Sequence, residues 1–238
     1  MRILALDSSG LVATVAILEN DILLAEYTVN YKKTHSQTLL PMLEKVKDMI
    51  DLDLQSIDAI AVAKGPGSFT GLRIGSATAK GLGLALDKPI IEIPTLEGLA
   101  YNLYGSQDMV CPIMDARREQ VYTGLYSFEG EKDFSLKEIM GQSAMSIQDL
   151  IHKINAIGRK VIFLGDGVPV FSNTIRELIE VPYSFAPAHM NRQRAGSVAA
   201  LAVRYYEAGK MVPTREHQPE YLRLSQAERE RMEQSHAE

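Results

Sequence analysis

The chain has 238 residues, of which 46% are hydrophobic and 23% charged, and its formal net charge at pH 7 is -5. That length suffices for one large domain or two small ones with a buried core. A single cysteine, Cys111, excludes an internal disulfide framework and is typical of a reducing compartment. No apolar run approaches the ~20 residues that span a bilayer, and no lysine- and arginine-rich tract predicts direct nucleic-acid binding. We therefore expect a cytoplasmic protein without membrane attachment.

The first half of the chain reads as strands followed by helices. A helix is expected over Thr34–Ile50 from its apolar spacing, although Pro41 inside it predicts a kink or a helix start nearby. Further helices are expected over Ser68–Leu86, where Ser68 is a good N-cap, and near Leu96–Tyr104. The expected strands are Ile3–Asp7, Val12–Leu18, Leu23–Val29, Asp58–Ala63 and Pro89–Ile93.

The order of elements then recurs about one hundred residues later. Val110–Asp115 followed by Gln120–Phe128 resembles the first strand hairpin. Val161–Gly167, which leads into a helix near Pro169–Ile179, resembles the strand, glycine turn and helix of the first half. This repeat predicts a duplication into two α/β domains.

We place the domain boundaries accordingly. The first domain is expected over residues 1–105 and the second over residues 106–213, with Ala195–Glu207 as its C-terminal helix. Residues 214–238 are strongly polar, and Ser225-Gln-Ala-Glu228 is a capping box that would open a charged terminal helix. We expect this tail to lie on the surface rather than in a core.

A stripe of small residues marks the helix expected over Ser68–Leu86. Gly71, Gly75, Ala79 and Gly83 recur every four residues and share one helix face. Each interior glycine costs about 1 kcal/mol relative to alanine, so the stripe indicates that another backbone comes very close. Two interpretations remain open: the stripe packs on the chain's own sheet, or it docks another subunit.

A glycine-rich loop, Gly65-Pro-Gly-Ser-Phe-Thr-Gly71, precedes the same helix. Backbone amides at a helix N-terminus bind anions. However, no Gly-Lys-Ser/Thr closes this loop, so it lacks the spacing of a P-loop. A tight strand-to-helix turn accounts for its glycines without a ligand.

Three aspartates are the candidates for a nucleotide cleft. Asp7 and Asp115 each end a hydrophobic strand, and Asp166 lies between two glycines. In paired α/β domains such residues can hold Mg-ATP between the domains. Aspartates before polar turns are also common turn formers, and we favour that interpretation while keeping the cleft as an alternative.

The sequence predicts neither a metal site nor a catalytic residue. The five histidines are scattered, and Leu39 stands four residues after His35, where a helical metal pair would need a second histidine. Cys111 has no evident base partner and lies in an apolar run, which favours a buried thiol.

Several segments together resemble the TsaB (YeaZ) family. The resemblance runs in order over residues 1–128, and Pro219-Glu-Tyr-Leu-Arg223 also suits the family's C-terminus. The most specific string is Gly65-Pro-Gly-Ser-Phe-Thr-Gly-Leu-Arg-Ile-Gly75. The other segments are Ile3-Leu-Ala-Leu-Asp-Ser-Ser9, His35-Ser-Gln-Thr-Leu-Leu-Pro41, Ala79-Lys-Gly81 and Asp115-Ala-Arg117.

The resemblance implies a sugar-kinase/Hsp70/actin-like fold of two ribonuclease-H-like domains. It also implies a role in making threonylcarbamoyladenosine beside the tRNA anticodon. In that pathway the paralogue TsaD, whose corresponding helix carries a metal-binding His-x-x-x-His, performs the transfer. TsaB is its non-catalytic dimerisation subunit, and the ATPase TsaE completes the complex. ATP and metal are then expected in the partner subunits, and tRNA is reached only through the complex.

The resemblance further implies where the partner docks. The family pairs two helices of its N-terminal domain with those of the partner in a four-helix bundle, and here these helices map to Thr34–Ile50 and Ser68–Leu86. The same surface would form a homodimer when TsaD is absent. The residues expected to bind the partner are His35, Leu39, Leu43, Val46, Phe69, Gly71, Leu72, Arg73, Gly75, Ala79 and Gly83. The alternative function is an autonomous ATP-dependent enzyme of the same superfamily, with Asp7 and Asp115 around a Mg-nucleotide.

Overall fold

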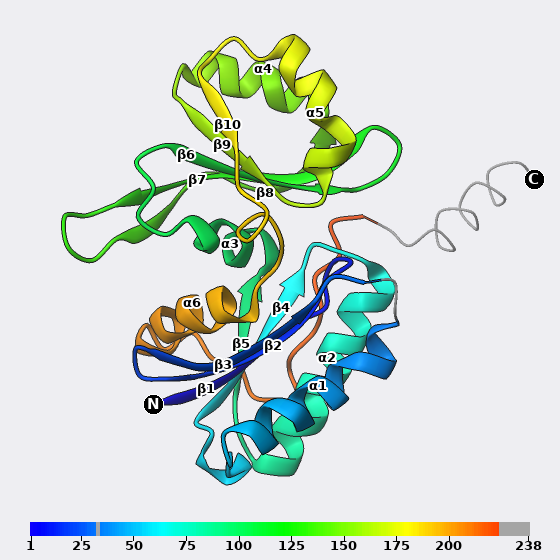
Figure 1. Cartoon of the computed structure of the whole chain (residues 1–238), viewed down its shortest axis with the longest axis vertical. Helices are drawn as coiled ribbons and strands as arrows, with labels where there is room; N and C mark the ends of the chain where they lie inside the picture. Colours follow the sequence, from blue (N-terminus) through cyan, green and yellow to red (C-terminus); the bar gives the residue numbers. More distant parts are fainter. Residues whose placement is uncertain (32–33, 224–238) are drawn as a thin grey trace, which may run out of the picture.

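Two mixed five-stranded sheets of identical topology form the protein (Figure 1). The computed structural model describes residues 1–31 and 34–223. The strand orders are β3-β2-β1-β4-β5 and, read from the meander side, β8-β7-β6-β9-β10. In each sheet an antiparallel meander is followed by two parallel strands. The predicted duplication into two ribonuclease-H-like α/β domains is thereby confirmed.

Most of the expected elements are present within one or two residues of their predicted ends. The elements of the first half are β1 (Arg2–Asp7), β2 (Ala13–Glu19), β3 (Ile22–Val29), α1 (His35–Met49), a 3-10 turn (Leu54–Ser56), β4 (Ala59–Gly65), α2 (Phe69–Leu86), β5 (Ile90–Pro94), α3 (Thr95–Ala100) and a second 3-10 turn (Tyr101–Leu103). Those of the second half are β6 (Met109–Asp115), β7 (Gln120–Glu129), β8 (Ser135–Ser146), α4 (Ile147–Ile157), β9 (Val161–Leu164), α5 (Gly167–Leu178), β10 (Tyr183–Phe185) and α6 (Ala195–Glu207).

The prediction missed the strands β8 and β10, the helix α4 and the 3-10 turn Leu54–Ser56. The segment of β8, Ser-Leu-Lys-Glu-Ile-Met-Gly-Gln-Ser-Ala-Met-Ser, does not alternate cleanly between apolar and polar residues. It is an edge strand with exposed and half-buried side chains, so burial imposed little pattern on it. Helix α1 continues through Pro41, and neither a break nor a new start occurs there.

Helices cover both faces of each sheet. Helices α1 and α2 pack on one face of the first sheet, where Leu4, Leu6 and Ile60 meet Leu39 and Leu43. Helices α3 and α6 cover its other face, and the second sheet lies against this same α3–α6 layer (Figure 1). Helices α4 and α5 cover the far face of the second sheet. One continuous core therefore joins the domains through α3 and α6.

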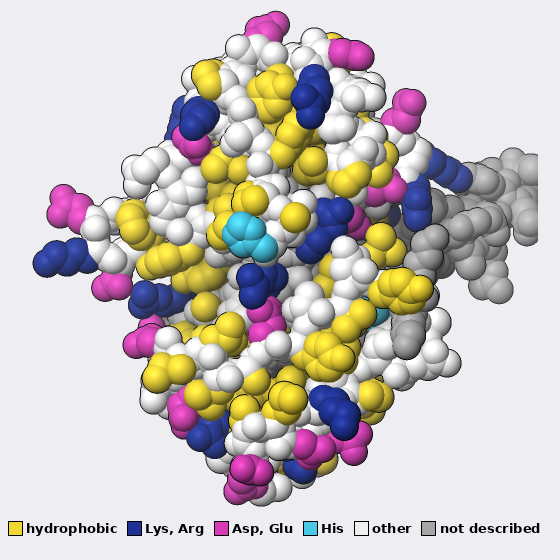
Figure 2. All heavy atoms as spheres, in the orientation of Figure 1, with side chains coloured by type: hydrophobic (Ala, Val, Ile, Leu, Met, Phe, Trp, Pro, Cys, Tyr) yellow, Lys and Arg dark blue, Asp and Glu magenta, His cyan; other side chains and the backbone are white. Residues whose placement is uncertain are grey.

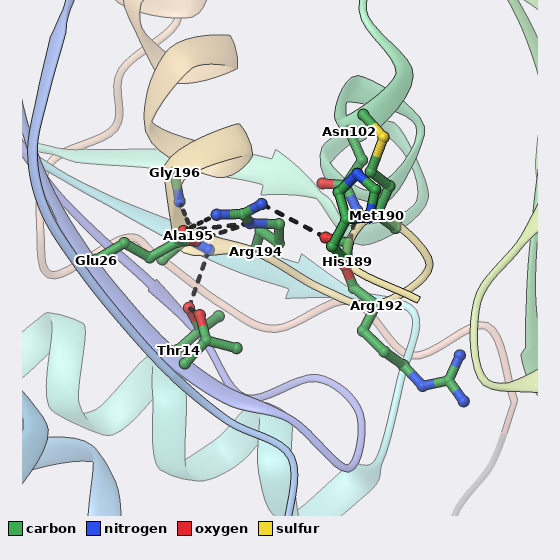
Figure 3. Close-up of polar contacts among 10 residues, drawn as sticks. Thr14, Glu26, Asn102, His189, Met190, Arg192, Arg194, Ala195 and Gly196 are labelled. Carbon is green, nitrogen blue, oxygen red and sulfur yellow. Dashed lines mark hydrogen bonds and ion pairs between the residues drawn. The ribbon is translucent and has the colours of Figure 1, made fainter. Parts of the chain in front are cut away.

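The prediction that α6 belongs to the second domain is wrong. The helix contacts β1, β2 and β5 of the first sheet, so the first domain takes up the chain again at Ala195. Two contacts at its N-terminus fix it there (Figure 3): the Ala195 amide donates to Thr14 Oγ1 at 3.1 Å, and the Gly196 amide donates to Glu26 Oε1 at 3.0 Å. Arg194 adds an ion pair with Glu26.

Glu26→Ala is expected to lower the free energy of unfolding by about 2 kcal/mol. The substitution removes the acceptor of the Gly196 amide and the partner of the Arg194 guanidinium, and hydrogen bonds to charged groups contribute about 1.5–3 kcal/mol. Urea unfolding measures the effect. The control Glu177→Ala, at an exposed carboxylate of α5, is expected to change stability by less than about 0.5 kcal/mol. Equal effects of the two variants would contradict the prediction.

The beginning of the expected polar tail is packed rather than loose. Thr214 and His217 are buried, and the His217 ring lies 2.7 Å from Glu92 Oε1 on β5. Lys80 Nζ donates to the carbonyls of Arg215 and His217. The terminal helix expected from Ser225 lies outside the described residues. Within residues 1–31 and 34–223, no helix is long and apolar enough to cross a membrane.

Candidate functional site

The small-residue stripe of α2 faces the chain's own backbone. A Cβ at Gly71 would lie 2.1 Å from the Ser8 carbonyl oxygen, and one at Gly75 would lie 2.6 Å from Ser8 Oγ. One at Gly67, just before the helix, would lie 2.3 Å from the Ser9 carbonyl oxygen. The turn after β1 therefore sits directly on the first two turns of α2, and this contact requires the glycines.

The other end of the stripe packs within the chain as well. A Cβ at Gly83 would lie 2.6 Å from Thr214 Oγ1, and Ala79 is fully buried. Of the residues expected to bind a partner, nearly all are turned inward. Leu39, Leu43, Val46, Gly71, Leu72, Gly75, Ala79 and Gly83 are buried in the chain itself. The chain's own core leaves these eight residues little exposed surface for a partner, and their role in partner binding stays a prediction. Arg73 is exposed, and Phe69 and His35 are partly covered by other parts of the chain.

On the opposite sides of the same two helices, α2 exposes small and apolar residues, whereas α1 exposes Leu40 and Met49 among polar and charged residues. Leu40 and Met49 of α1 are 52% and 85% exposed, and Leu84 of α2 is 56% exposed. Small residues continue this surface on α2, and a Cβ at Gly81 would meet no described atom within 4 Å. Hydrophobic side chains are visible on the surface over this helix pair in Figure 2. We call the exposed residues Ala77, Gly81, Leu84 and Ala85 of α2 the outer face.

A cleft of about 540 Å³ opens between the two domains. The first domain lines it with Ser9, His35 and Ser68, and the second domain lines it with Asp115 and Asp166. The strand ends β1 and β6 thus meet across one space, as the internal repeat predicts. Ser9 Oγ and His35 Nδ1 are buried without a partner in the described chain.

Asp7 lies behind the cleft rather than in its lining. Its side chain is 2% exposed, and its Oδ1 accepts a hydrogen bond from the Ser9 amide at 2.8 Å. Burial raises the pKa of the Asp7 carboxyl from 3.8 to about 6, because the charged form loses its hydration. The hydrogen bonds to Ser9 act in the opposite direction but are weaker. This hydrogen bond, from the backbone amide two residues later, is typical of an aspartate that stabilises a turn.

Asp115 and Asp166 come together at the second domain's side of the cleft. The Asp115 amide donates to Asp166 Oδ1 at 3.2 Å, and burial raises the pKa of the Asp166 carboxyl. Asp115 Oδ1 accepts from the Arg117 amide at 2.8 Å, and its Oδ2 pairs with the Arg117 guanidinium at 3.1 Å. Both aspartates therefore hold local backbone, and both also line the cleft.

His35 ties α1 to the first turn. Its Nε2 donates to the Gly10 carbonyl at 2.8 Å, and Leu39, one helical turn later, is buried in the core. Among the described residues, no group of three or more His, Cys, Asp or Glu side chains is arranged to hold a metal ion.

The segment 218–223, which we call the strap, contributes Tyr221, Leu222 and Arg223 to the lining of the cleft. The Glu220 amide donates to the Lys64 carbonyl at 2.6 Å, and the Tyr221 ring stacks on Phe69 at 4.6 Å. Arg223 Nη1 then donates to the Ala116 carbonyl of the second domain at 2.6 Å. A Cβ at Gly65 would lie 2.1 Å from the Glu220 carbonyl oxygen, which accounts for the first glycine of the loop. Sequence analysis noted Pro219–Arg223 only as part of the family resemblance and did not predict how the segment packs, because a polar segment gives no periodic signal.

Comparison with known proteins gives a consistent result. The family model described as TsaD, tRNA N6-adenosine threonylcarbamoyltransferase, matches residues 23–231. The tRNA threonylcarbamoyladenosine biosynthesis protein TsaB of Bacillus subtilis is 34% identical over 228 residues, which cover 96% of each chain. The protein of the same name from Escherichia coli is 27% identical over 94% of this chain and 95% of its own. The solved structure of YeaZ from Pseudomonas aeruginosa superposes with a TM-score of 0.78 at 26% identity, covering 93% of this chain and 99% of that one. The chain belongs to the TsaB (YeaZ) family.

Proposed function

We propose that this chain is a non-catalytic subunit that binds a TsaD-type paralogue and supports threonylcarbamoyl transfer to tRNA. The family's name, tRNA threonylcarbamoyladenosine biosynthesis protein, supports the pathway. In this proposal the ATPase TsaE and the tRNA are reached through the complex, and ATP and metal belong to the partner subunits.

The observation that carries the docking proposal is the outer face of α2, together with the exposed apolar side chains of α1. Exposed apolar side chains on two adjacent helices are costly in water unless another surface covers them. Ala77, Gly81 and Ala85 have small side chains or none, so a second helix pair can approach the backbone of α2 closely. The four-helix arrangement implied by the family resemblance is thus retained, but its contact residues lie on the opposite side of α2 from the stripe.

Gly81→Arg is expected to abolish the one-to-one complex with TsaD from the same source. The arginine would stand in the middle of the outer face, while the monomer has open space for it and gains helix propensity. Light scattering of the mixture, with circular dichroism of the variant alone, measures both effects. Ala156→Arg, at an exposed position of α4, is the matched control and is expected to bind normally. A normal complex formed by a folded Gly81→Arg protein would rule out docking through the outer face.

The second candidate is an autonomous ATP-dependent enzyme that uses the interdomain cleft. The convergence of Asp115 and Asp166 on that cleft favours it. The strap opposes it, since Tyr221 and Arg223 take up part of the wall of the same space and are held there by Phe69 and the Ala116 carbonyl. Calorimetric titration of the isolated chain with Mg-ATP separates the two proposals. Binding that Asp166→Asn abolishes would support the enzyme, and absence of binding beside an intact TsaD complex would support the subunit.

A further inference from the structure

The residue just before the strap, His217, is the buried anchor of the segment after α6. Of residues 213–223, only Thr214 and His217 are buried, and none belongs to the hydrophobic cores of the two sheets. In Figure 1 this orange-to-red segment runs from β5 past α2 toward the second domain. The position of the strap therefore depends on a few polar and ring contacts, among which those of His217 are the most deeply buried.

The contacts of the His217 ring suit its neutral form. Its Nδ1 lies 2.7 Å from Glu92 Oε1 on β5, and because a carboxylate can only accept, the ring donates this hydrogen bond. The neutral ring then carries no hydrogen on Nε2, an atom that is buried without a partner in the described chain. The Gln218 amide donates to the same Glu92 oxygen at 3.4 Å, so the first residue of the strap is held at this point as well.

Charged groups from three elements of the first domain surround the ring. They are Glu92 of β5, Lys64 of β4 and Lys80 of α2. Lys64 Nζ lies 3.7 Å from Glu92 Oε2 and 3.6 Å from Glu220 Oε2, so Glu92 already has a cationic partner. Lys80 Nζ donates to the His217 carbonyl at 2.9 Å, which brings a second ammonium group to the same residue. A positive charge on the ring would add to two positive charges that are already present.

Protonation of His217 is therefore unfavourable while the ring stays in place. The added proton would create an N–H group at Nε2 that has no acceptor among the described residues. Burial lowers the pKa of the His217 ring below its ordinary value of 6.5, Lys80 and Lys64 act in the same direction, and the Glu92 carboxylate opposes them. Because the pKa is lower in place than after release, the contact contributes fully above pH 6.5 and weakens as the pH falls below that value.

We propose that His217 is an acid-sensitive latch, whose protonation releases the strap from the first sheet while both domains stay folded. On release, Tyr221 leaves the Phe69 ring and Arg223 leaves the Ala116 carbonyl, so both side chains withdraw from the wall of the interdomain cleft. The domains keep their fold, because the three hydrophobic cores contain no residue of this segment. The latch is independent of partner docking and of the outer face.

Hydrogen exchange of the Glu220 amide, measured by NMR on the full-length protein, tests the proposal. This amide donates to the Lys64 carbonyl only while the strap is in place. We expect its protection factor, which corrects for the intrinsic pH dependence of exchange, to be at least about tenfold lower at pH 5.5 than at pH 7.5, because local opening sets the exchange rate. Amides of β1 and β6 are expected to stay protected at both pH values. Equal protection of the Glu220 amide at both pH values, or loss of protection throughout the chain, would overturn the proposal.

Two variants assign the pH dependence to His217. His217→Gln keeps an N–H donor for Glu92 but cannot be protonated, so protection of the Glu220 amide is expected to be the same at pH 5.5 and pH 7.5. His152→Gln, at an exposed histidine of α4, is the matched control and is expected to retain the wild-type pH dependence. The same loss of protection in His217→Gln as in the wild type would overturn the assignment.

The NMR titration of the His217 ring in the wild-type protein decides the case in which His217→Gln has already lost the strap at pH 7.5. We expect the ring to carry its single proton on Nδ1 at pH 7.5, and its protonation to share a midpoint with the loss of protection at Glu220. A His217 ring that becomes protonated while the Glu220 amide stays protected would overturn the proposal.

Discussion

Gly71→Ala is expected to lower the free energy of unfolding by at least about 3 kcal/mol, at the upper end of overpacking effects. The new methyl carbon would lie 2.1 Å from the Ser8 carbonyl oxygen, far inside van der Waals contact. That carbonyl belongs to the backbone of a buried turn, and Ser8 Oγ also donates to the Gly71 carbonyl at 2.9 Å. Neither side of the contact can move without disturbing the other.

Gly81→Ala is the matched control on the same helix, and its effect should have the opposite sign. A Cβ at Gly81 meets no described atom within 4 Å, so the substitution should stabilise the protein by about 1 kcal/mol through helix propensity. Urea unfolding of the two variants measures both effects. Equal and small changes would show that the turn after β1 yields freely, and would remove the close-packing explanation of the stripe.

The difference between the packed and the open side of α2 also decides which substitution can test partner docking. Gly75→Leu would place side-chain atoms against Ser8 Oγ, which lies only 2.6 Å from the position of the new Cβ. Loss of a complex in that variant would reflect loss of the fold. Substitutions at Gly81 avoid this ambiguity, because the outer face has space for them.

Asp7→Asn is expected to stabilise the protein by about 3 kcal/mol at pH 7.5, and by almost nothing at pH 4. The pKa of the Asp7 carboxyl is about 6 in the folded state, against an ordinary value of 3.8. A difference of this size corresponds to about 3 kcal/mol. Because the folded pKa is the higher one, the protonated carboxyl favours folding below pH 4. That contribution is lost as the pH rises through about 6.

Unfolding curves recorded at several pH values between 4 and 7.5 measure the effect. Asparagine keeps an oxygen acceptor for the Ser9 amide and carries no charge, so it isolates the cost of burying the carboxylate. Asp21→Asn, in an exposed turn, is the control and is expected to show no comparable pH dependence. A stability difference between Asp7→Asn and wild type that does not vary with pH would contradict the prediction.

Sequence analysis predicted most of the fold because the two domains repeat one hydrophobic pattern. The strands β1, β4, β6 and β9 are buried on both faces and read as apolar runs, and α1 and α6 carry clear amphipathic spacing. The edge strand β8 and the packing of the strap were not predicted, because half-exposed segments need no regular hydrophobic pattern. The assignment of α6 to the second domain failed for a different reason. Position along the chain does not determine which of two sheets an apolar helix face covers.

The sequence by itself determined the duplicated α/β architecture, the family, and the presence of a helix that must meet another backbone closely. These features depend on local spacing and on motif strings, which are written in the order of residues. Only the tertiary structure decided that the close neighbour is Ser8 of the same chain, and that the other side of α2 is exposed. It alone also brought Ser9, Asp115 and Asp166 to one cleft between the domains. Such groupings arise when segments far apart in sequence pack together, and no periodicity along the chain encodes them.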